Sequence, residues 1–187
     1  MSLFNLILLA LIQGVTEFLP VSSSGHLALL PNLTGLEDQG QTLDVAVHVG
    51  TLGAVILYFW ADVRMGIAGI PRLLTGRADT PGAKLALLLL IATIPVILAG
   101  LVIHLTGVAA ALRSVAVIGW TMLLFGIVLY IADRWGPADR SAEAWSIRDA
   151  VIMGLWQAVA LIPGTSRSGI TITAGRFLGY DRESAAR

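Results

Sequence analysis

The stretch Gln13–His26, QGVTEFLPVSSSGH, interrupts an apolar run that begins at Leu3. Glu17 and Pro20 end that run, and three serines, a glycine and a histidine follow. A second stretch, Pro163–Gly169 (PGTSRSG), interrupts another apolar run in the same way. Polar backbone at membrane depth is tolerated only where it is buried in protein or lines a wet cavity. The two stretches therefore predict two helix–loop–helix units inside a membrane protein.

The composition of the whole chain also indicates a membrane setting. Of its 187 residues, 56% are hydrophobic and 13% are charged, whereas soluble domains carry about 25% charged residues. The net charge is zero, so no nucleic-acid partner is predicted. The chain has no cysteine, which excludes disulfides and thiolate metal sites. We expect no cleaved signal peptide, because the first basic residue is Arg64.

Three apolar runs are long enough to cross a bilayer, which takes roughly 17 to 25 residues. They cover Leu43–Trp60, Leu85–Leu105 and Ser114–Ala132. The apolar pieces that follow the two polar breaks, 27–33 and 170–178, are too short to cross. Each interrupted unit should therefore enter and leave the membrane on one side. We expect re-entrant units at 3–34 and 147–179.

The basic residues give an expected orientation. Most of the twelve Lys and Arg residues lie in three segments, 61–84, 133–149 and 176–187, which the positive-inside rule assigns to the cytoplasm. With these segments inside, the first re-entrant unit enters from outside and the second from the cytoplasm. We therefore predict an all-α polytopic membrane protein, a single membrane domain over 1–187 that contains two inverted-topology repeats.

The two units also resemble each other in sequence. The matched pairs are Gln13 with Gln157, Ser22 with Ser166, Ser24 with Ser168, and Gly25 with Gly169. At the same offset Ser23 stands opposite Arg167. The first repeat would cover 1–132 and the second would start at 147. Since three spanning segments follow the first unit, symmetry predicts three further helices after the second, so that the second repeat is truncated here.

Glu17 is the first candidate for chemistry, because a carboxylate at the centre of a membrane helix costs about 2.5–3.5 kcal/mol. Gln13 lies one turn earlier on the same helical face. The pair could hold a divalent cation, Mg²⁺ or Ca²⁺, through oxygen, together with phosphate oxygens of a substrate. A hydrogen bond between Gln13 and Glu17 without a metal is the structural alternative.

The serine run is a candidate anion site. Ser22 through Gly25 would open a short helix, whose N–H groups and dipole suit a phosphate, or the serines would only cap that helix. His26 follows Ser23 by three residues, within reach as a proton acceptor or as a nucleophile toward phosphorus. Attack by Ser23, attack by His26 and attack by water remain open.

Arg167 stands between two serines in the second break. Its planar guanidinium suits phosphate, with snorkelling to the interface as the alternative. Neighbouring hydroxyls that could add donors belong to Ser166, Ser168 and Thr171. Asp44 and His48, one turn apart in a spanning segment, fit a structural pair as well as a site. His104, at the end of a spanning segment, is expected at the interface.

These groups together are typical of phosphoryl transfer, in which positioning and charge stabilisation dominate. A site within the bilayer indicates a substrate whose tail stays in lipid. The alternative is a polyprenyl-phosphate flippase or a secondary transporter with a midplane anion site, since inverted repeats with broken helices are common in transporters.

Two motifs resemble those of a known family. The stretch from Gln13 to His26 resembles the first signature of the bacterial undecaprenyl pyrophosphate phosphatases, the bacitracin-resistance family, and 163–171 resembles the second. The resemblance implies removal of one phosphate from undecaprenyl pyrophosphate, which recycles the carrier lipid for cell-wall synthesis. It also implies a multi-pass protein of the bacterial plasma membrane and a homodimer.

The resemblance further implies residue roles. It links the glutamate motif, Gln13 and Glu17, to catalysis and a divalent cation. It links Ser23 and His26 to attack on the pyrophosphate, and Arg167 to phosphate binding. The family's functional positions match Gln13, Glu17, Ser23, His26, Ser166, Arg167 and Thr171.

Overall fold

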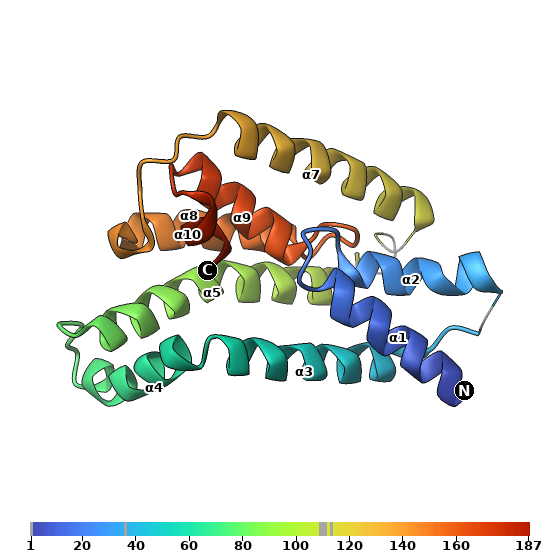
Figure 1. The fold of residues 1–187 in the computed structure, drawn as a ribbon, viewed down its shortest axis with the longest axis horizontal. Helices are drawn as coiled ribbons and strands as arrows, with labels where there is room; N and C mark the ends of the chain where they lie inside the picture. Colours follow the sequence, from blue (N-terminus) through green and yellow to red (C-terminus); the bar gives the residue numbers. More distant parts are fainter. Residues whose placement is uncertain (1, 36, 109–111, 113) are drawn as a thin grey trace.

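The computed structural model of the chain describes residues 2–35, 37–108, 112 and 114–187, and these fold into an elongated helical bundle (Figure 1). The all-α prediction is confirmed. The α-helices are α1 (Leu3–Thr16), α2 (Ser23–Thr34), α3 (Gly40–Tyr58), α4 (Trp60–Leu74), α5 (Pro81–Thr106), α7 (Val115–Trp135), α8 (Ile147–Val159), α9 (Arg167–Phe177) and α10 (Arg182–Ala186). A 3-10 turn, η1 (Ala142–Ala144), and an isolated β-bridge between Arg140 and Tyr180 complete the described structure.

Among the described residues, two helices are long and apolar enough to cross a membrane on their own, α5 and α7. Helix α5 starts at Pro81 rather than Leu85, because the Thr80 side chain accepts from the backbone of Ala83 and a proline fits the first turn. Helix α7 starts after its N-cap, Ser114, and continues to Trp135. The two helices support the assignment to membrane proteins.

The apolar run 43–60 ends in a sharp bend. Helix α3 ends at Tyr58 and α4 starts at Trp60, and the two axes differ by 88°. Sequence analysis did not predict α4. The helix was hidden because its apolar residues alternate with charged ones and with a proline, namely Asp62, Arg64, Pro71 and Arg72. Glycines hold α4 against α5, since a Cβ on Gly69 would lie 2.2 Å from the backbone of Gly82.

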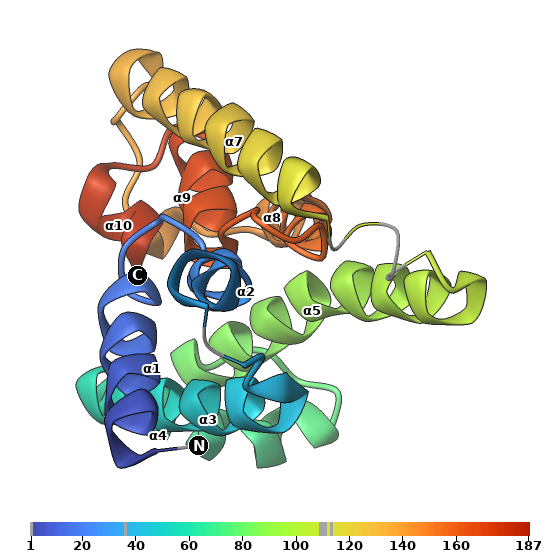
Figure 2. The ribbon, with the colours of Figure 1, turned by 90° about the vertical axis from the view of Figure 1, so that its right-hand side faces the viewer.

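Both interrupted units fold as helix–loop–helix hairpins. The first hairpin is α1 and α2, and the second is α8 and α9. Their loops approach the middle of the bundle from opposite ends of its long axis (Figure 1). Seen along that axis, α2 lies inside a ring of neighbouring helices (Figure 2). The loops touch, because a Cβ on Gly169 would lie 3.2 Å from the carbonyl oxygen of Pro20. Opposite insertion into a membrane stays a prediction.

An ion pair between the buried Asp149 carboxylate and the half-buried Arg140 anchors the second hairpin at the end away from its loop. Asp149, 3% exposed, accepts from the Arg140 guanidinium at 2.6 Å, from the Ser146 hydroxyl at 2.7 Å and from the Tyr180 hydroxyl at 2.9 Å. Burial, reinforced by the Asp149 carboxylate, raises the pKa of Tyr180 to about 12, so the phenol keeps its proton and donates it. The Arg140 guanidinium also stacks 4.4 Å from the Tyr180 ring.

A second buried cation joins α9 to the end of α7. The Arg176 guanidinium donates to backbone carbonyls of Asp133, Gly136, Pro137 and Tyr180. Its Nε lies 3.5 Å from the Asp133 carboxylate. These contacts satisfy most of a buried charge with carbonyl acceptors, so they fix the position of the second hairpin.

Candidate active site

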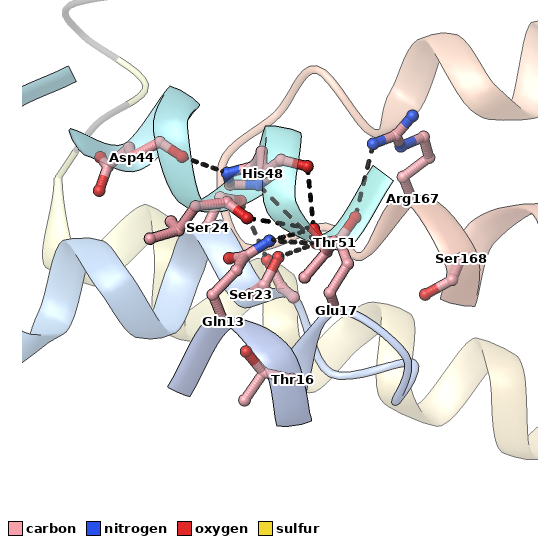
Figure 3. A network of polar contacts seen from close by, with 12 residues as sticks. Gln13, Thr16, Glu17, Ser23, Ser24, Asp44, His48, Thr51, Arg167 and Ser168 are labelled. Carbon is pink, nitrogen blue, oxygen red and sulfur yellow. Dashed lines mark hydrogen bonds and ion pairs between the residues drawn. The ribbon is translucent and has the colours of Figure 1, made fainter. Parts of the chain in front are cut away.

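Glu17 lies at the centre of a polar network that joins both hairpins to α3 (Figure 3). It is the C-cap of α1, and its Oε2 accepts from the Ser23 hydroxyl and, at 3.0 Å, from the Gln13 amide. The His48 Nε2 lies 3.7 Å from the same oxygen. The other oxygen, Oε1, lies 3.6 Å from Nη2 of Arg167. The carboxylate therefore meets a hydroxyl, an amide and two basic side chains.

Gln13 sets the position of this carboxylate. Its side chain is fully buried and its amide nitrogen also donates to Oγ1 of Thr51 on α3, at 3.3 Å. The Thr51 hydroxyl in turn lies 3.0 Å from the carbonyl oxygen of His48. Because Gln13 bridges Glu17 and Thr51, it fixes how α1 sits against α3.

The two loops present their serines in the same way. The Ser22 hydroxyl caps α2 by accepting from the Gly25 N–H at 3.3 Å, and the Ser166 hydroxyl caps α9 by accepting from the Gly169 N–H at 3.1 Å. Ser23 and Arg167 are then the first residues of their helices, as the matched pairs predict. An anion bound at either helix N-terminus would meet first-turn N–H groups and the positive end of a helix dipole.

A pocket of about 140 Å³ lies between the two loops and α3. Its lining residues are Thr16, Glu17, Ser22, Ser23, Ser24, His48, Ala160, Thr165, Ser166, Arg167 and Ser168. The structure thus brings together most of the residues that the sequence singles out. A wider hollow, about 500 Å³, lies at the surface beside Arg72 and Arg77 and contains none of the network.

Three predicted site residues support the loops instead of lining the pocket. The Nδ1 atom of His26 lies 2.8 Å from the Ser22 carbonyl oxygen, which closes the first loop. The Thr171 hydroxyl donates to a carbonyl one turn earlier in its own helix, at 3.0 Å. Gly25 makes room for α7, because a Cβ there would lie 3.3 Å from the Met122 sulfur. Their predicted roles in catalysis and binding stay predictions.

Among the pocket residues that are not predicted site residues are His48 and Thr165. The sequence does not separate a structural role for His48 from a role in the site, because the spacing from Asp44 shows a shared helix face but not which element packs against that face. Thr165 is buried, and its hydroxyl has no hydrogen-bond partner among the described residues. A threonine inside a loop gives no sequence signal of its own, and the only available signal for Thr165 is its position next to Ser166.

The predicted divalent cation can be tested against the donors. Within residues 2–35, 37–108, 112 and 114–187, no group of three or more His, Cys, Asp or Glu residues could hold a metal ion. Gln13 presents its amide nitrogen to Glu17, and its buried Oε1 has no hydrogen-bond partner among the described residues. Glu17 lines the pocket beside the hydroxyl of Ser23. One carboxylate with neighbouring hydroxyls fits a cation that shares its ligands with substrate phosphates, as Mg²⁺ often does.

Known proteins resemble this chain over its length. The family model described as bacitracin resistance protein BacA matches residues 6–187. A protein of Jannaschia sp. (strain CCS1), named undecaprenyl-diphosphatase, is 76% identical over 187 residues, which cover 100% of this chain and 70% of that protein. A protein of the same name from Ruegeria pomeroyi is 72% identical with the same coverage. One from Idiomarina loihiensis is 50% identical over 188 residues, again covering 100% of this chain and 70% of that protein.

Proposed function

The chain belongs to the bacitracin resistance protein BacA family, and from that premise we propose that it is an undecaprenyl-diphosphatase. It hydrolyses undecaprenyl pyrophosphate to undecaprenyl phosphate and inorganic phosphate, which recycles the carrier lipid for cell-wall synthesis. The observation that carries this proposal is the Ser23–Glu17 hydrogen bond opposite Arg167, in one pocket shared by the two hairpins. A hydroxyl, its proton acceptor and a phosphate-binding cation are the parts that phosphoryl transfer requires.

Arg167 and the two helix N-termini bind the pyrophosphate. The Arg167 side chain is 66% exposed, and its 3.6 Å approach to Glu17 is long for a hydrogen bond, so the guanidinium is free to turn toward an arriving phosphate. The hydroxyls of Ser166 and Ser168 lie beside it, 3.1 Å from each other. The second hairpin thereby supplies the positive charge and the hydroxyl donors that bind the phosphate.

Ser23 attacks the terminal phosphorus from the first hairpin. Glu17 accepts the hydroxyl proton as the new P–O bond forms, and the bond from phosphorus to the bridging oxygen breaks to release undecaprenyl phosphate. Water then hydrolyses the phosphoserine and releases phosphate. Attack by His26 has less support, because His26 is outside the pocket lining.

Glu17 is the residue that would hold a divalent cation. Mg²⁺ or Ca²⁺ bound there, together with phosphate oxygens, would neutralise charge on the pyrophosphate. Gln13 would contribute by fixing the carboxylate. Its Oε1, which has no partner within the described part of the chain, would become a ligand only if the side-chain amide exchanged the positions of its nitrogen and oxygen.

The protein acts as a multi-pass protein of the bacterial inner membrane, with the hairpins inserted from opposite faces. The apolar surfaces of α5 and α7 support this setting, as does the approach of the two loops from opposite ends of the bundle (Figure 1). The polyprenyl tail stays in lipid while the pyrophosphate enters the pocket. A homodimer, which the family resemblance implies, is part of this proposal.

The test is phosphate release from undecaprenyl pyrophosphate by the protein purified in detergent, with and without a chelator. Arg167→Ala should lower the rate about 10²- to 10³-fold, because one stabilising donor to the transition state is worth that much. Arg72→Ala, in an exposed pair with Asp79, is the matched control and should keep the wild-type rate. Near-normal activity of Arg167→Ala would reject the site. Movement of the lipid across liposomes without phosphate release would identify the flippase alternative.

A further inference from the structure

We propose that α4 lies along the surface of the membrane, with its apolar face in lipid and its basic face among the phosphates of anionic phospholipids. The inference rests on the membrane setting of the proposed function and not on the hydrolysis reaction. Helix α4 is the helix that sequence analysis did not predict, and the pocket between the hairpins contains none of its residues.

The bend at Phe59 turns α4 away from the direction of α3. Helix α3 has 19 residues, which at 1.5 Å per residue reach about 28 Å, enough to cross a hydrocarbon core of about 30 Å. The axis of α4 differs from that of α3 by 88°. Figure 1 shows α4 at the end of the bundle where α5 begins. With α3 crossing the bilayer, α4 therefore lies in the plane of the membrane surface.

The same end of the bundle carries the basic segments of the chain. An ion pair of 2.7 Å joins Arg187 to Asp62, near the start of α4. Another ion pair of 2.7 Å joins Arg182 to Asp133, near the end of α7. The three basic segments thus gather at one end of the bundle, which the positive-inside rule assigns to the cytoplasm.

An apolar stripe runs along an exposed face of α4. Trp60, Ile67 and Leu74 follow one another at intervals of seven residues, which is about two turns, and therefore share a face. Ile67 is 59% exposed and Leu74 is 82% exposed. A different face packs on α5, where a Cβ on Gly82 would lie 2.2 Å from the carbonyl oxygen of Met65. In a membrane protein, lipid is the apolar phase that an exposed stripe of this kind meets.

Exposed basic side chains lie on a further face of α4. Arg64 and Arg72 are eight residues apart, so they share a face that is distinct from the apolar stripe. Helices that lie in a membrane interface have this arrangement, with Lys or Arg on the polar face and Trp or Leu on the apolar one. Trp60, at the start of α4, is also a residue type that favours the interface.

Segment 61–84 has positive charge left over for an anionic partner. It contains four basic and two acidic residues, and its two acids, Asp62 and Asp79, each form an ion pair with an arginine. Within the described part of the chain, Arg64 and Arg77 make no ion pair. Anionic headgroups of the cytoplasmic leaflet attract such segments. A path of α4 through the hydrocarbon would instead bury Arg64 among acyl chains, which is costly.

Nitroxide labels on single cysteines test the depth of α4, because the chain has no cysteine of its own. The full chain is placed in vesicles of phosphatidylcholine and phosphatidylglycerol, and collisions with oxygen and with a polar relaxation agent report the depth of each label. Ile67→Cys should lie about 5–10 Å into the boundary between headgroups and acyl chains. Ala68→Cys, exposed on the basic face, should lie among the phosphates or in water. Ile94→Cys, exposed in the middle of α5, is the control and should lie about 15 Å inside the hydrocarbon.

The labels distinguish this arrangement from the others. Equal depths at positions 67 and 68 would overturn the inference, whether both labels lie in lipid, as in a crossing helix, or both lie in water. Shielding of the label at 67 from both reagents would also overturn it, since protein would then cover the apolar face. A label at 94 outside the lipid would remove the membrane setting as well, which is a separate result.

The lipid composition around α4 tests its basic face. A fluorophore on Ile67→Cys is quenched by acyl-brominated lipid, supplied as either the phosphatidylglycerol or the phosphatidylcholine of an equal mixture. Phosphatidylglycerol should quench more, and Arg64→Gln should lower this preference by up to about fivefold, the effect of one basic residue near an anionic surface. Arg134→Gln is the matched control, because this exposed arginine ends α7 on the side of the bundle opposite α4 (Figures 1 and 2), and it should leave the preference unchanged. No preference for phosphatidylglycerol, or equal effects of the two substitutions, would overturn the inference.

Discussion

The two hairpins have the same capping loop but carry different functional side chains at the start of the second helix. In each loop a serine hydroxyl caps the following helix through the N–H of a glycine, Gly25 in the first and Gly169 in the second. In each, that serine also contacts the serine two residues later, at 3.4 Å and 3.1 Å respectively. The first helix residue is Ser23 in one hairpin and Arg167 in the other. A duplicated capping loop thus carries a nucleophile once and a cation once.

The hairpins also differ in how firmly they are held. The second is fixed by the buried carboxylate of Asp149 and the buried guanidinium of Arg176. The first has Glu17 in its loop, and its main polar link to the rest of the bundle is the Gln13–Thr51 hydrogen bond. The comparison teaches that chemistry is concentrated in one hairpin and anchoring in the other. Neither hairpin is a complete site alone.

The largest expected effect comes from a substitution that removes the proton acceptor of the first hairpin. Glu17→Gln should lower the rate of phosphate release about 10³-fold, because the amide cannot take a proton from Ser23. The fold should survive, since glutamine has nearly the same shape. Glu37→Gln, on an exposed acid between α2 and α3, is the control and should be fully active. A Glu17→Gln variant within tenfold of wild type would remove Glu17 as the proton acceptor.

The next largest effect is expected from a substitution that removes the buried carboxylate anchoring the second hairpin. Asp149→Ala should lower the free energy of unfolding by about 3–5 kcal/mol, because it leaves the Arg140 guanidinium and the Tyr180 hydroxyl without their buried acceptor. The measurement is unfolding of the purified protein by denaturant in detergent. Asp79→Ala, which breaks the exposed pair with Arg72, should leave the midpoint unchanged. Equal effects of the two substitutions would contradict the anchoring role.

Substitutions at His26 should have a smaller effect, and they distinguish a structural role in the first loop from a role as the nucleophile. If its Nδ1 serves to close the first loop on the Ser22 carbonyl, His26→Ala should cost about tenfold in activity through misplacement of Ser23. His26→Asn, whose amide reaches the Nδ1 position, should recover most of that loss. A nucleophilic His26 would instead leave both variants equally inactive, which a phosphate-release assay distinguishes.

Local signals allowed much of this comparison to be predicted from sequence. The polar breaks lie within apolar runs, so both hairpins and the serine, glycine and arginine positions follow from short-range pattern. The bend between α3 and α4 does not, because it occurs at Phe59, where neither proline nor glycine marks a break. Charged residues spread along α4 also hid its apolar face.

Two pocket residues that the sequence did not predict, His48 and Thr165, were missed because their positions also depend on contacts between distant parts of the chain. The place of His48 depends on the Gln13–Thr51 hydrogen bond, which joins residues far apart in the chain. Periodicity places His48 on the same helix face as Asp44 but does not say which helix that face meets. Thr165 is similar, because its burial results from how the second loop packs in the bundle. Tertiary contacts between helices, not local patterns, decide both positions.

The smallest expected effect concerns the capping serines themselves. Ser22 has φ of 62°, in the left-handed region, whereas Ser166 has φ of −67°. Alanine at either position removes a cap, at about 0.5–2 kcal/mol, but glycine at position 22 also relieves a left-handed conformation that costs other residues about 1–2 kcal/mol. The stability gap between the Gly and Ala variants should therefore be larger at 22 than at 166, by about 1 kcal/mol. Denaturant unfolding of the four variants measures it. Equal gaps would mean that the first loop stores no backbone strain, and the contrast between a strained reactive hairpin and a relaxed anchored one would be lost.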